Sequence, residues 1–184
     1  MSQKNSKARI INNLLDKESF LEIKKFIMSP RCDWRFLDFV ASKEDYTKGN
    51  KNGYFIHSFK DINPATNEDR FPESPKFHLM LKILEKMKFN KLLRIRCSLF
   101  PRRDVQERDE YHIDYPFPHT TGIYYLNTNN GYTMFENGEK IPSVENQFAI
   151  FNGSEKHCTV VQTDTPARYI INFNVIWALN NLEL

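Results

Sequence analysis

The stretch Tyr111-His112-Ile113-Asp114-Tyr115-Pro116 decides how the rest of the sequence is interpreted. In an extended strand, side chains two residues apart point to the same side, so His112 and Asp114 would face one shared point. An imidazole and a carboxylate are two of the three ligands of a 2-His-1-carboxylate site for Fe(II), which leaves metal positions open for other molecules. A His-x-Asp pair is short enough to occur by chance, so its meaning depends on a third ligand and a suitable scaffold.

The composition indicates a single globular domain. Of the 184 residues, 40% are hydrophobic and 27% are charged, and a chain of this length can bury a core without disulfides or metals. Aromatic residues make up 14%, which suits a sheet-rich core. The formal charge of +3 is too small to indicate binding to nucleic acid or to an anionic membrane.

The cysteines and the N-terminus favour a cytoplasmic protein. Cys32, Cys97 and Cys158 are odd in number and widely spaced, which favours free thiols over a disulfide framework. The first residues contain no long apolar run typical of a signal peptide. No segment approaches the length of about 18 apolar residues that a membrane span needs, so we expect no membrane partner.

The first half of the chain predicts two helices and a long polar segment. Asp16 fits the N-cap of a helix over residues 17–28, and a second helix is expected over residues 75–88. Each has an apolar stripe at helical spacing, formed in the first by Phe20, Ile23 and Ile27 and in the second by Phe77, Met80, Leu81, Leu84 and Met87. Residues 31–75 are expected to be irregular, with the segment 42–73 either covering a binding site or forming a surface insertion without a role.

From residue 91 onward the hydrophobic pattern changes to period two. In the strand expected over residues 93–99, one face is apolar and the other carries Arg96 and Ser98. Short strands are then expected at 120–127, 132–135, 147–151, 157–163 and 168–177. Helices followed by many short strands predict an α+β fold, a double-stranded β-helix (a cupin-like jelly roll) with N-terminal helices packed on one sheet. We expect one domain over residues 1–184, with a helical part at about 10–90 and a jelly-roll core at about 91–178.

His157 is the best candidate for the third metal ligand. It follows a tight turn and opens a strand, whereas His78 falls in a helix, His57 in the irregular segment and His119 off the parity of the first pair. A single histidine in a strand is more often a plain surface or core residue than a ligand. His157 is favoured because Arg168 follows it with ten residues between them.

Taken together, these elements resemble the Fe(II)/2-oxoglutarate-dependent oxygenases, in particular the prolyl-4-hydroxylase-like branch. The matching pieces are His112-x-Asp114, His157, Arg168 and the segment Ile123-Tyr124-Tyr125-Leu126-Asn127, which looks like the family's Y-Y-L-N strand. The N-terminal stretch 10–27 is similar to the family's helical entry. Residues 31–75 match least.

The resemblance implies a hydroxylating dioxygenase that uses Fe(II), O2 and 2-oxoglutarate and releases succinate and CO2. His112, Asp114 and His157 would hold the iron and so form the catalytic centre. Arg168 would bind the far carboxylate of 2-oxoglutarate, since arginine offers a permanent charge and a bidentate fork, and Tyr125 would add a hydrogen bond.

One position departs from the family pattern. Relatives often have a tyrosine where this chain has Phe100. A hydroxyl is therefore missing from the expected cosubstrate pocket, and Ser98 or Arg96 on the same strand face are the candidates that would compensate.

The sequence leaves the substrate and the oligomeric state open. A protein side chain and a small molecule are both compatible with the pattern. The candidate substrate residues are Tyr115 and Phe117, which follow the ligand pair, and Asn172 and Asn174, which share the parity of Arg168.

Two other classes of protein remain open. A non-catalytic jelly-roll module that binds sugars or another protein would not bring the three ligands together. A cupin-like metalloprotein of other chemistry would bring them together, but with Arg168 pointing away from the metal.

Overall fold

The computed structural model describes residues 8–38 and 53–176, which form two antiparallel sheets and two helices. The larger sheet has seven strands, in the order β1 (Ala8–Ile11), β8 (Gln147–Asn152), β5 (Thr120–Tyr125), β10 (Ala167–Ile176), β4 (Lys91–Pro101), β3 (Tyr54–Asp61) and β2 (Arg35–Leu37). The smaller sheet has three, in the order β7 (Lys140–Ser143), β6 (Asn129–Phe135) and β9 (His157–Val160). The helices are α1 (Lys17–Ile27) and α3 (His78–Leu84).

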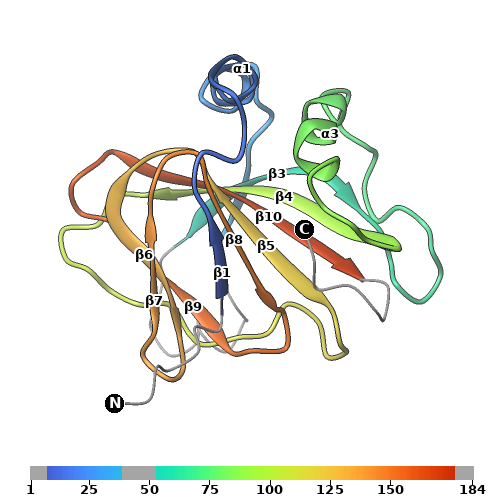
Figure 1. The fold of residues 1–184 in the computed structure, drawn as a ribbon. Coiled ribbons are helices and arrows are strands. Elements are labelled where there is room, and N and C mark those ends of the chain that lie inside the picture. The colour runs from blue at the N-terminus through green and yellow to red at the C-terminus, as the bar shows by residue number, and fades with distance from the viewer. Residues whose placement is uncertain (1–7, 39–52, 177–184) are drawn as a thin grey trace.

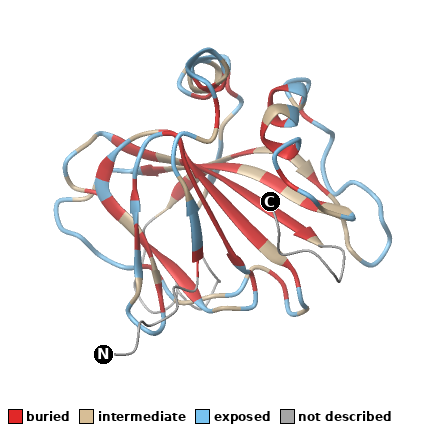
Figure 2. Cartoon of the chain, viewed as in Figure 1, coloured by how far each residue is buried: buried red, intermediate tan, exposed pale blue. Residues whose placement is uncertain are grey.

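The large sheet separates two hydrophobic cores. Both helices lie on one of its faces, and the small sheet lies on the other side (Figure 1). On the helix side, Ile95 of β4 and Phe173 of β10 belong to the cluster that includes the buried stripe of α1. On the inter-sheet side, Phe100 and Ile170 belong to a second cluster. Because both faces are covered, the central strands are buried along most of their length (Figure 2), and the expected α+β jelly roll with helices on one sheet is confirmed.

The first helix forms as the sequence predicts. The carboxylate of Asp16 accepts a hydrogen bond from the backbone N–H of Ser19 at 2.9 Å, which caps the free N-terminal end. The stripe of Phe20, Ile23 and Ile27 is buried against the sheet. Only the last residue differs, since the helix ends at Ile27 and Met28 is its C-cap.

The second helix is shorter than the expected range of 75–88. It spans only His78–Leu84. Backbone bonds between residues three apart flank it on both sides, from Phe77 N to Ser74 O and from Met87 N to Leu84 O. These tighter turns still bury Met87 in the core, so the apolar stripe extends beyond the α-helix itself.

The expectation that residues 31–75 are irregular is wrong at 35–37 and at 54–61, where the chain forms strands. Strand β3 has eight residues and pairs along β4, while β2 pairs with β3 at the edge of the sheet. The register shifts between Ser58 and Lys60. A bulge of this kind interrupts the period-two pattern and hides the strand from sequence analysis. Residues 39–52 lie outside the described part of the chain, and they include the beginning of the 42–73 segment that could cover a binding site.

Two other strands differ from the sequence expectation. The expected helical entry at 10–27 begins as strand instead, because Ile10 and Ile11 belong to β1 and pair with β8. Strand β7 was not anticipated, since it is short and contains Pro142, a residue found mainly at sheet edges. The end of the strand expected at 168–177 lies outside the described residues at Trp177. The single-domain assignment stays a prediction, and the described chain contains no helix long and apolar enough to cross a membrane.

Candidate metal centre

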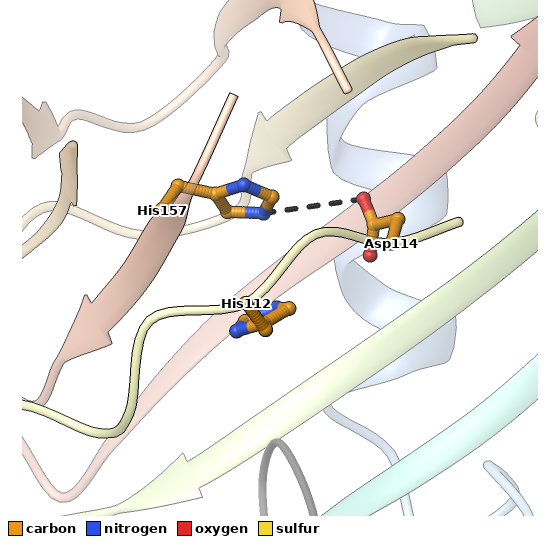
Figure 3. Close-up of side chains that lie close together, drawn as sticks. All are labelled: His112, Asp114 and His157. Atoms are coloured by element: carbon orange, nitrogen blue, oxygen red, sulfur yellow. Dashed lines mark ion pairs between the residues drawn. The ribbon is translucent and has the colours of Figure 1, made fainter. Parts of the chain in front are cut away.

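His112, Asp114 and His157 come together between the two sheets (Figure 3). One ligand atom from each side chain lies within 4.8 Å of the other two. His157 comes from β9 of the small sheet, and the other two come from the segment that passes beside it. A histidine 43 positions away from Asp114 in the sequence therefore lies beside the first pair, and its role as the third metal ligand remains a prediction.

A backbone bridge sets the two imidazoles side by side. The N–H of His112 donates to the carbonyl of His157 at 3.0 Å, and the N–H of His157 donates to the carbonyl of His112 at 3.0 Å. The ring centroids are 4.7 Å apart. The extended backbone at His112 then directs Asp114, two residues later, toward the same space.

Both imidazoles are oriented by backbone carbonyls. Nδ1 of His157 lies 2.9 Å from the carbonyl of Glu155, and Nδ1 of His112 lies 3.3 Å from the carbonyl of Glu110. A carbonyl can only accept, so the proton sits on Nδ1 and Nε2 keeps its lone pair, an arrangement typical of metal-binding histidines. Burial, together with the neighbouring His157, lowers the pKa of His112 to about 4. At neutral pH this ring is therefore in the uncharged form that binds metals.

Three donors hold the carboxylate of Asp114. Arg94 donates to Oδ1 at 2.8 Å, and Thr121 and Asn174 donate to Oδ2 at 2.8 and 2.9 Å. Arg94 also donates from Nε to the amide oxygen of Asn174 at 3.0 Å, which ties the donors together. Burial alone would raise the pKa of Asp114, but the guanidinium of Arg94 and the two histidines lower it far below its usual range. Asp114 is therefore a fixed anion, as a metal ligand must be.

Arg168 is a buried cation surrounded by hydroxyl groups. Its side chain is 0% exposed, and its nitrogens donate to Ser143 at 2.7 Å, Thr133 at 3.1 Å and Thr159 at 3.5 Å. The hydroxyl of Tyr125 lies 3.0 Å from that of Thr133. Burial lowers the pKa of Arg168, yet a guanidinium stays charged at neutral pH because its ordinary value is so high. No carboxylate in residues 8–38 or 53–176 forms an ion pair with it.

The other candidate residues from β4 and β10 face the same interior. Ser98 and Arg96 share the face of β4 that carries Phe100 of the inter-sheet cluster. Asn172 and Asn174 share the face of β10 that carries Arg168, and they are 8% and 0% exposed. Solvent exposure, the ordinary expectation for the polar face of an alternating strand, does not apply here.

The segment after the ligand pair packs over Arg94. The rings of Tyr115 and Phe117 stack with centroids 5.2 Å apart, and the guanidinium of Arg94 lies 5.4 Å from the ring centroid of Tyr115. Tyr115 is buried, and Phe117 is partly exposed. Both candidates therefore lie close to His112, Asp114 and His157, and Tyr115 is the more deeply buried of the two.

Several residues around the candidate site were not among the sequence predictions. Arg94 and Thr121 share the parity of Arg96 and Tyr125, so strand alternation was the signal that could have found them. Tyr54 belongs to β3, which was not predicted at all. Its ring is buried and stacks on Phe100 with centroids 5.1 Å apart and an angle of 5°. A phenol from the neighbouring strand thus lies beside Phe100, the position at which the family resemblance predicts a tyrosine.

A separate recess of about 280 Å³ is lined by residues of β3 and of the segment 71–76, and not by His112, Asp114 or His157. His57 lies on its wall. Both ring nitrogens of His57 have partners, the carbonyl of Asp33 at 3.0 Å and the hydroxyl of Ser74 at 3.1 Å. These contacts give His57 a structural role, and the chemistry of the side chains places the candidate site between the sheets instead.

Several solved structures with a similar fold are 2-oxoglutarate-dependent oxygenases. An oxidoreductase of the 2OG-Fe(II) oxygenase family from Burkholderia pseudomallei is 7% identical, with a TM-score of 0.68 over 94% of this chain and 86% of its own. The viral collagen prolyl hydroxylase of Paramecium bursaria Chlorella virus-1, in its 2OG complex, is 12% identical, with a TM-score of 0.57 over 95% of this chain and 98% of its own. This chain has the fold of the prolyl-4-hydroxylase-like 2-oxoglutarate oxygenases.

A third neighbour, HygX from Streptomyces hygroscopicus, has nickel and 2-oxoglutarate bound. It is 11% identical, with a TM-score of 0.57 over 95% of this chain and 84% of its own. No protein-family model matches the sequence, and the curated proteins give no match. At these identities the likeness to a 2-oxoglutarate oxygenase establishes the fold, and the argument for function comes from the side chains.

The site geometry bears on the two alternative classes. A non-catalytic jelly-roll module predicted that His112, Asp114 and His157 would stay apart, and they lie together. A cupin-like metalloprotein of other chemistry predicted that Arg168 would point away, and Arg168 lies in the same inter-sheet space, with β9 residue Thr159 among its partners.

Proposed function

We propose that this protein is an Fe(II)- and 2-oxoglutarate-dependent dioxygenase that hydroxylates a substrate held between its two sheets. One observation supports the proposal above the others. A triad of suitable ligand atoms within 4.8 Å of one another shares the inter-sheet space with a buried arginine that has no carboxylate partner among the described residues.

The residues present fit the metal. Nε2 of His112, Nε2 of His157 and one oxygen of Asp114 would hold the ion, a ligand set that suits Fe(II) and leaves three positions open. Fe(II) and 2-oxoglutarate together supply the two-electron oxidation of an unactivated C–H bond, with O2 as the oxidant and succinate and CO2 as coproducts.

The residues of the chain prepare the site for this chemistry. The Glu110 and Glu155 carbonyls fix the imidazole orientations, and Arg94 keeps Asp114 ionised and in place. Arg168 would bind the far carboxylate of 2-oxoglutarate through a charge-assisted fork. The hydroxyl of Tyr125, close to that fork, would donate to the same carboxylate.

The test is metal and cosubstrate binding in ligand variants. Wild-type protein should gain thermal stability with Fe(II) under anaerobic conditions, and should produce succinate from 2-oxoglutarate in air. Asp114→Ala and His157→Ala should each lose both responses. Asp104→Ala removes the same charge at an exposed position and should retain both. Wild-type protein that neither binds metal nor forms succinate would contradict the proposal.

The fold does not specify the substrate, and both a protein side chain and a small molecule are compatible with the proposal. The cytoplasmic location also remains a prediction from the cysteines and the N-terminal sequence.

A further inference from the structure

A row of unsatisfied polar atoms crosses the inter-sheet face beside the metal residues. Strand register places Ser58 of β3, Arg96 of β4 and Asn172 of β10 opposite one another. Ser58 Oγ, Arg96 Nε and Asn172 Oδ1 are all buried, and none has a hydrogen-bond partner within the described chain. A buried polar group without a partner costs about 1–3 kcal/mol. Three such atoms in one row therefore mark a place for a polar ligand.

Arg96 also takes no part in the ion pairs that its charged neighbours form. Arg94 is paired with Asp114 at 2.8 Å, and Asp61 is paired with Arg70 at 3.6 Å. For Arg96, no carboxylate in the described ranges lies within ion-pair distance. The inter-sheet space around Arg96 therefore carries one positive charge in excess, which suits an anionic group on the ligand.

Arg96 lies at the metal end of the inter-sheet space. It is the next residue inward from Arg94 on the same strand face, about 7 Å along β4. Arg94, its neighbour on that face, is ion-paired with Asp114 at 2.8 Å, so Arg96 lies one position from the contact with the candidate metal ligands. Phe100, which contacts Arg168, is four residues further, about 13 Å along the strand. Arg96 therefore lies nearer to the candidate metal ligands than to Arg168, away from the pocket for the far carboxylate.

Hydrogen-bond acceptors lie close to this cation. Asn172 Oδ1 is one of them. Asp61, which is 7% exposed and opposite Arg94 in the register, has an Oδ1 that makes no hydrogen bond with the described residues. The 3.6 Å separation between Asp61 and Arg70 is too long for a hydrogen bond. Both acceptors suit a group with N–H donors, such as an ammonium.

We propose, on the basis of the proposed function, that the substrate is a free amino acid whose carboxylate binds Arg96 and whose ammonium group binds Asn172 and Asp61. A cation for a carboxylate next to acceptors for an ammonium is the recognition pattern that a small zwitterion requires. A residue inside a peptide chain has neither charge on its backbone, so it would leave Arg96 unpaired. The side chain of the bound amino acid would carry the C–H bond that is hydroxylated.

The experiment measures binding without turnover. Protein loaded with Ni(II) and 2-oxoglutarate is titrated with each of the common free L-amino acids and with the corresponding amino acid amides, using calorimetry. At least one free amino acid should bind, and its amide should bind about 30-fold more weakly or worse because the carboxylate is gone. The Arg96→Gln substitution should weaken binding of the free amino acid by a similar factor. The matched control Arg9→Gln, at an exposed position of β1, should bind it as the wild type does.

The outcomes separate this inference from the function on which it rests. 2-Oxoglutarate should bind Arg96→Gln within about twofold of its wild-type affinity, whereas a tenfold loss would assign Arg96 to the cosubstrate and overturn the inference. Equal binding of acid and amide would favour a peptide substrate, and no binding by any amino acid would also overturn it. Failure of the wild type to bind Ni(II) and 2-oxoglutarate would instead overturn the proposed function itself.

Discussion

The substitution Arg168→Met should abolish 2-oxoglutarate binding while leaving the metal-free protein at least as stable as the wild type. Methionine approximates the length of the arginine side chain but removes the charge and the donors. In the complex, the far carboxylate would then be buried without its partner, which costs about 3–5 kcal/mol. This corresponds to a loss of affinity of about 100-fold to 5,000-fold.

Two opposing effects set the stability of the metal-free variant. Removing a buried cation that has no carboxylate partner among the described residues should gain about 1–4 kcal/mol. The hydroxyl of Ser143 loses the 2.7 Å bond it accepts, at a cost of about 1 kcal/mol, whereas the hydroxyl of Thr133 retains Tyr125 as a partner. The net change therefore lies between zero and a gain of about 3 kcal/mol.

The assay pairs calorimetric titration of 2-oxoglutarate with thermal unfolding of the metal-free protein. A gain of about 1 kcal/mol would raise the melting temperature by about 2–4 °C in a chain of this size. Unchanged affinity for 2-oxoglutarate in Arg168→Met would refute the assigned role of Arg168. A fall in melting temperature by more than about 10 °C would show that the guanidinium is a structural group and not a preorganised binding group.

Three further predictions follow from buried contacts. The pKa of His112 is lowered from 6.5 to about 4, so the unfolded chain takes up a proton at a higher pH than the folded protein does. The free energy of unfolding, measured in urea, should be at its full value above pH 6.5 and should fall by at most about 3 kcal/mol as the pH drops to 4. The His112→Gln variant should lose less stability over the same pH range. Gly153→Ala would bring a Cβ to 2.0 Å from Nε2 of His119 and should cost about 2 kcal/mol in denaturant unfolding; an unchanged midpoint would contradict this packing. Asn146→Ala removes the 2.6 Å hydrogen bond from Tyr124 and both hydrogen bonds with the Leu15 backbone, and it places alanine at a positive φ of 58°. The free energy of unfolding in denaturant should fall by about 3 kcal/mol, and a fall below about 1 kcal/mol would contradict these contacts.

The sequence predicts the parts of the fold in which local pattern and tertiary packing agree. The cap at Asp16 and the stripe through Phe20 and Ile27 specify α1 almost to the residue. Strand β4 is recognisable because its apolar and polar residues alternate, and the two sets face different environments, the helix-side core and the inter-sheet space. Strand β3 is not, since the bulge after Ser58 shifts its period and since Ser58 and Asp61 face the polar residues Arg96 and Arg94 of β4.

The candidate site is predictable where its residues are close in sequence or regularly spaced. His112, Asp114, His157 and Arg168 were found through spacing and resemblance. Arg94 was not, because its importance comes from the register of β4 and β10, which places it opposite Asn174 and within reach of Asp114. Strand register depends on long-range pairing, and a single sequence does not contain that information directly.

The most direct test of the central claim is an anaerobic titration of the Fe(II)-loaded protein with 2-oxoglutarate, followed by visible absorption. Chelation of Fe(II) by a 2-oxo acid produces a metal-to-ligand charge-transfer band. The wild type should develop this band and saturate at one 2-oxoglutarate per iron, and Asp114→Ala should develop none. A wild-type protein that shows no band with Fe(II) and excess 2-oxoglutarate would contradict the assignment of His112, Asp114 and His157 as an iron site.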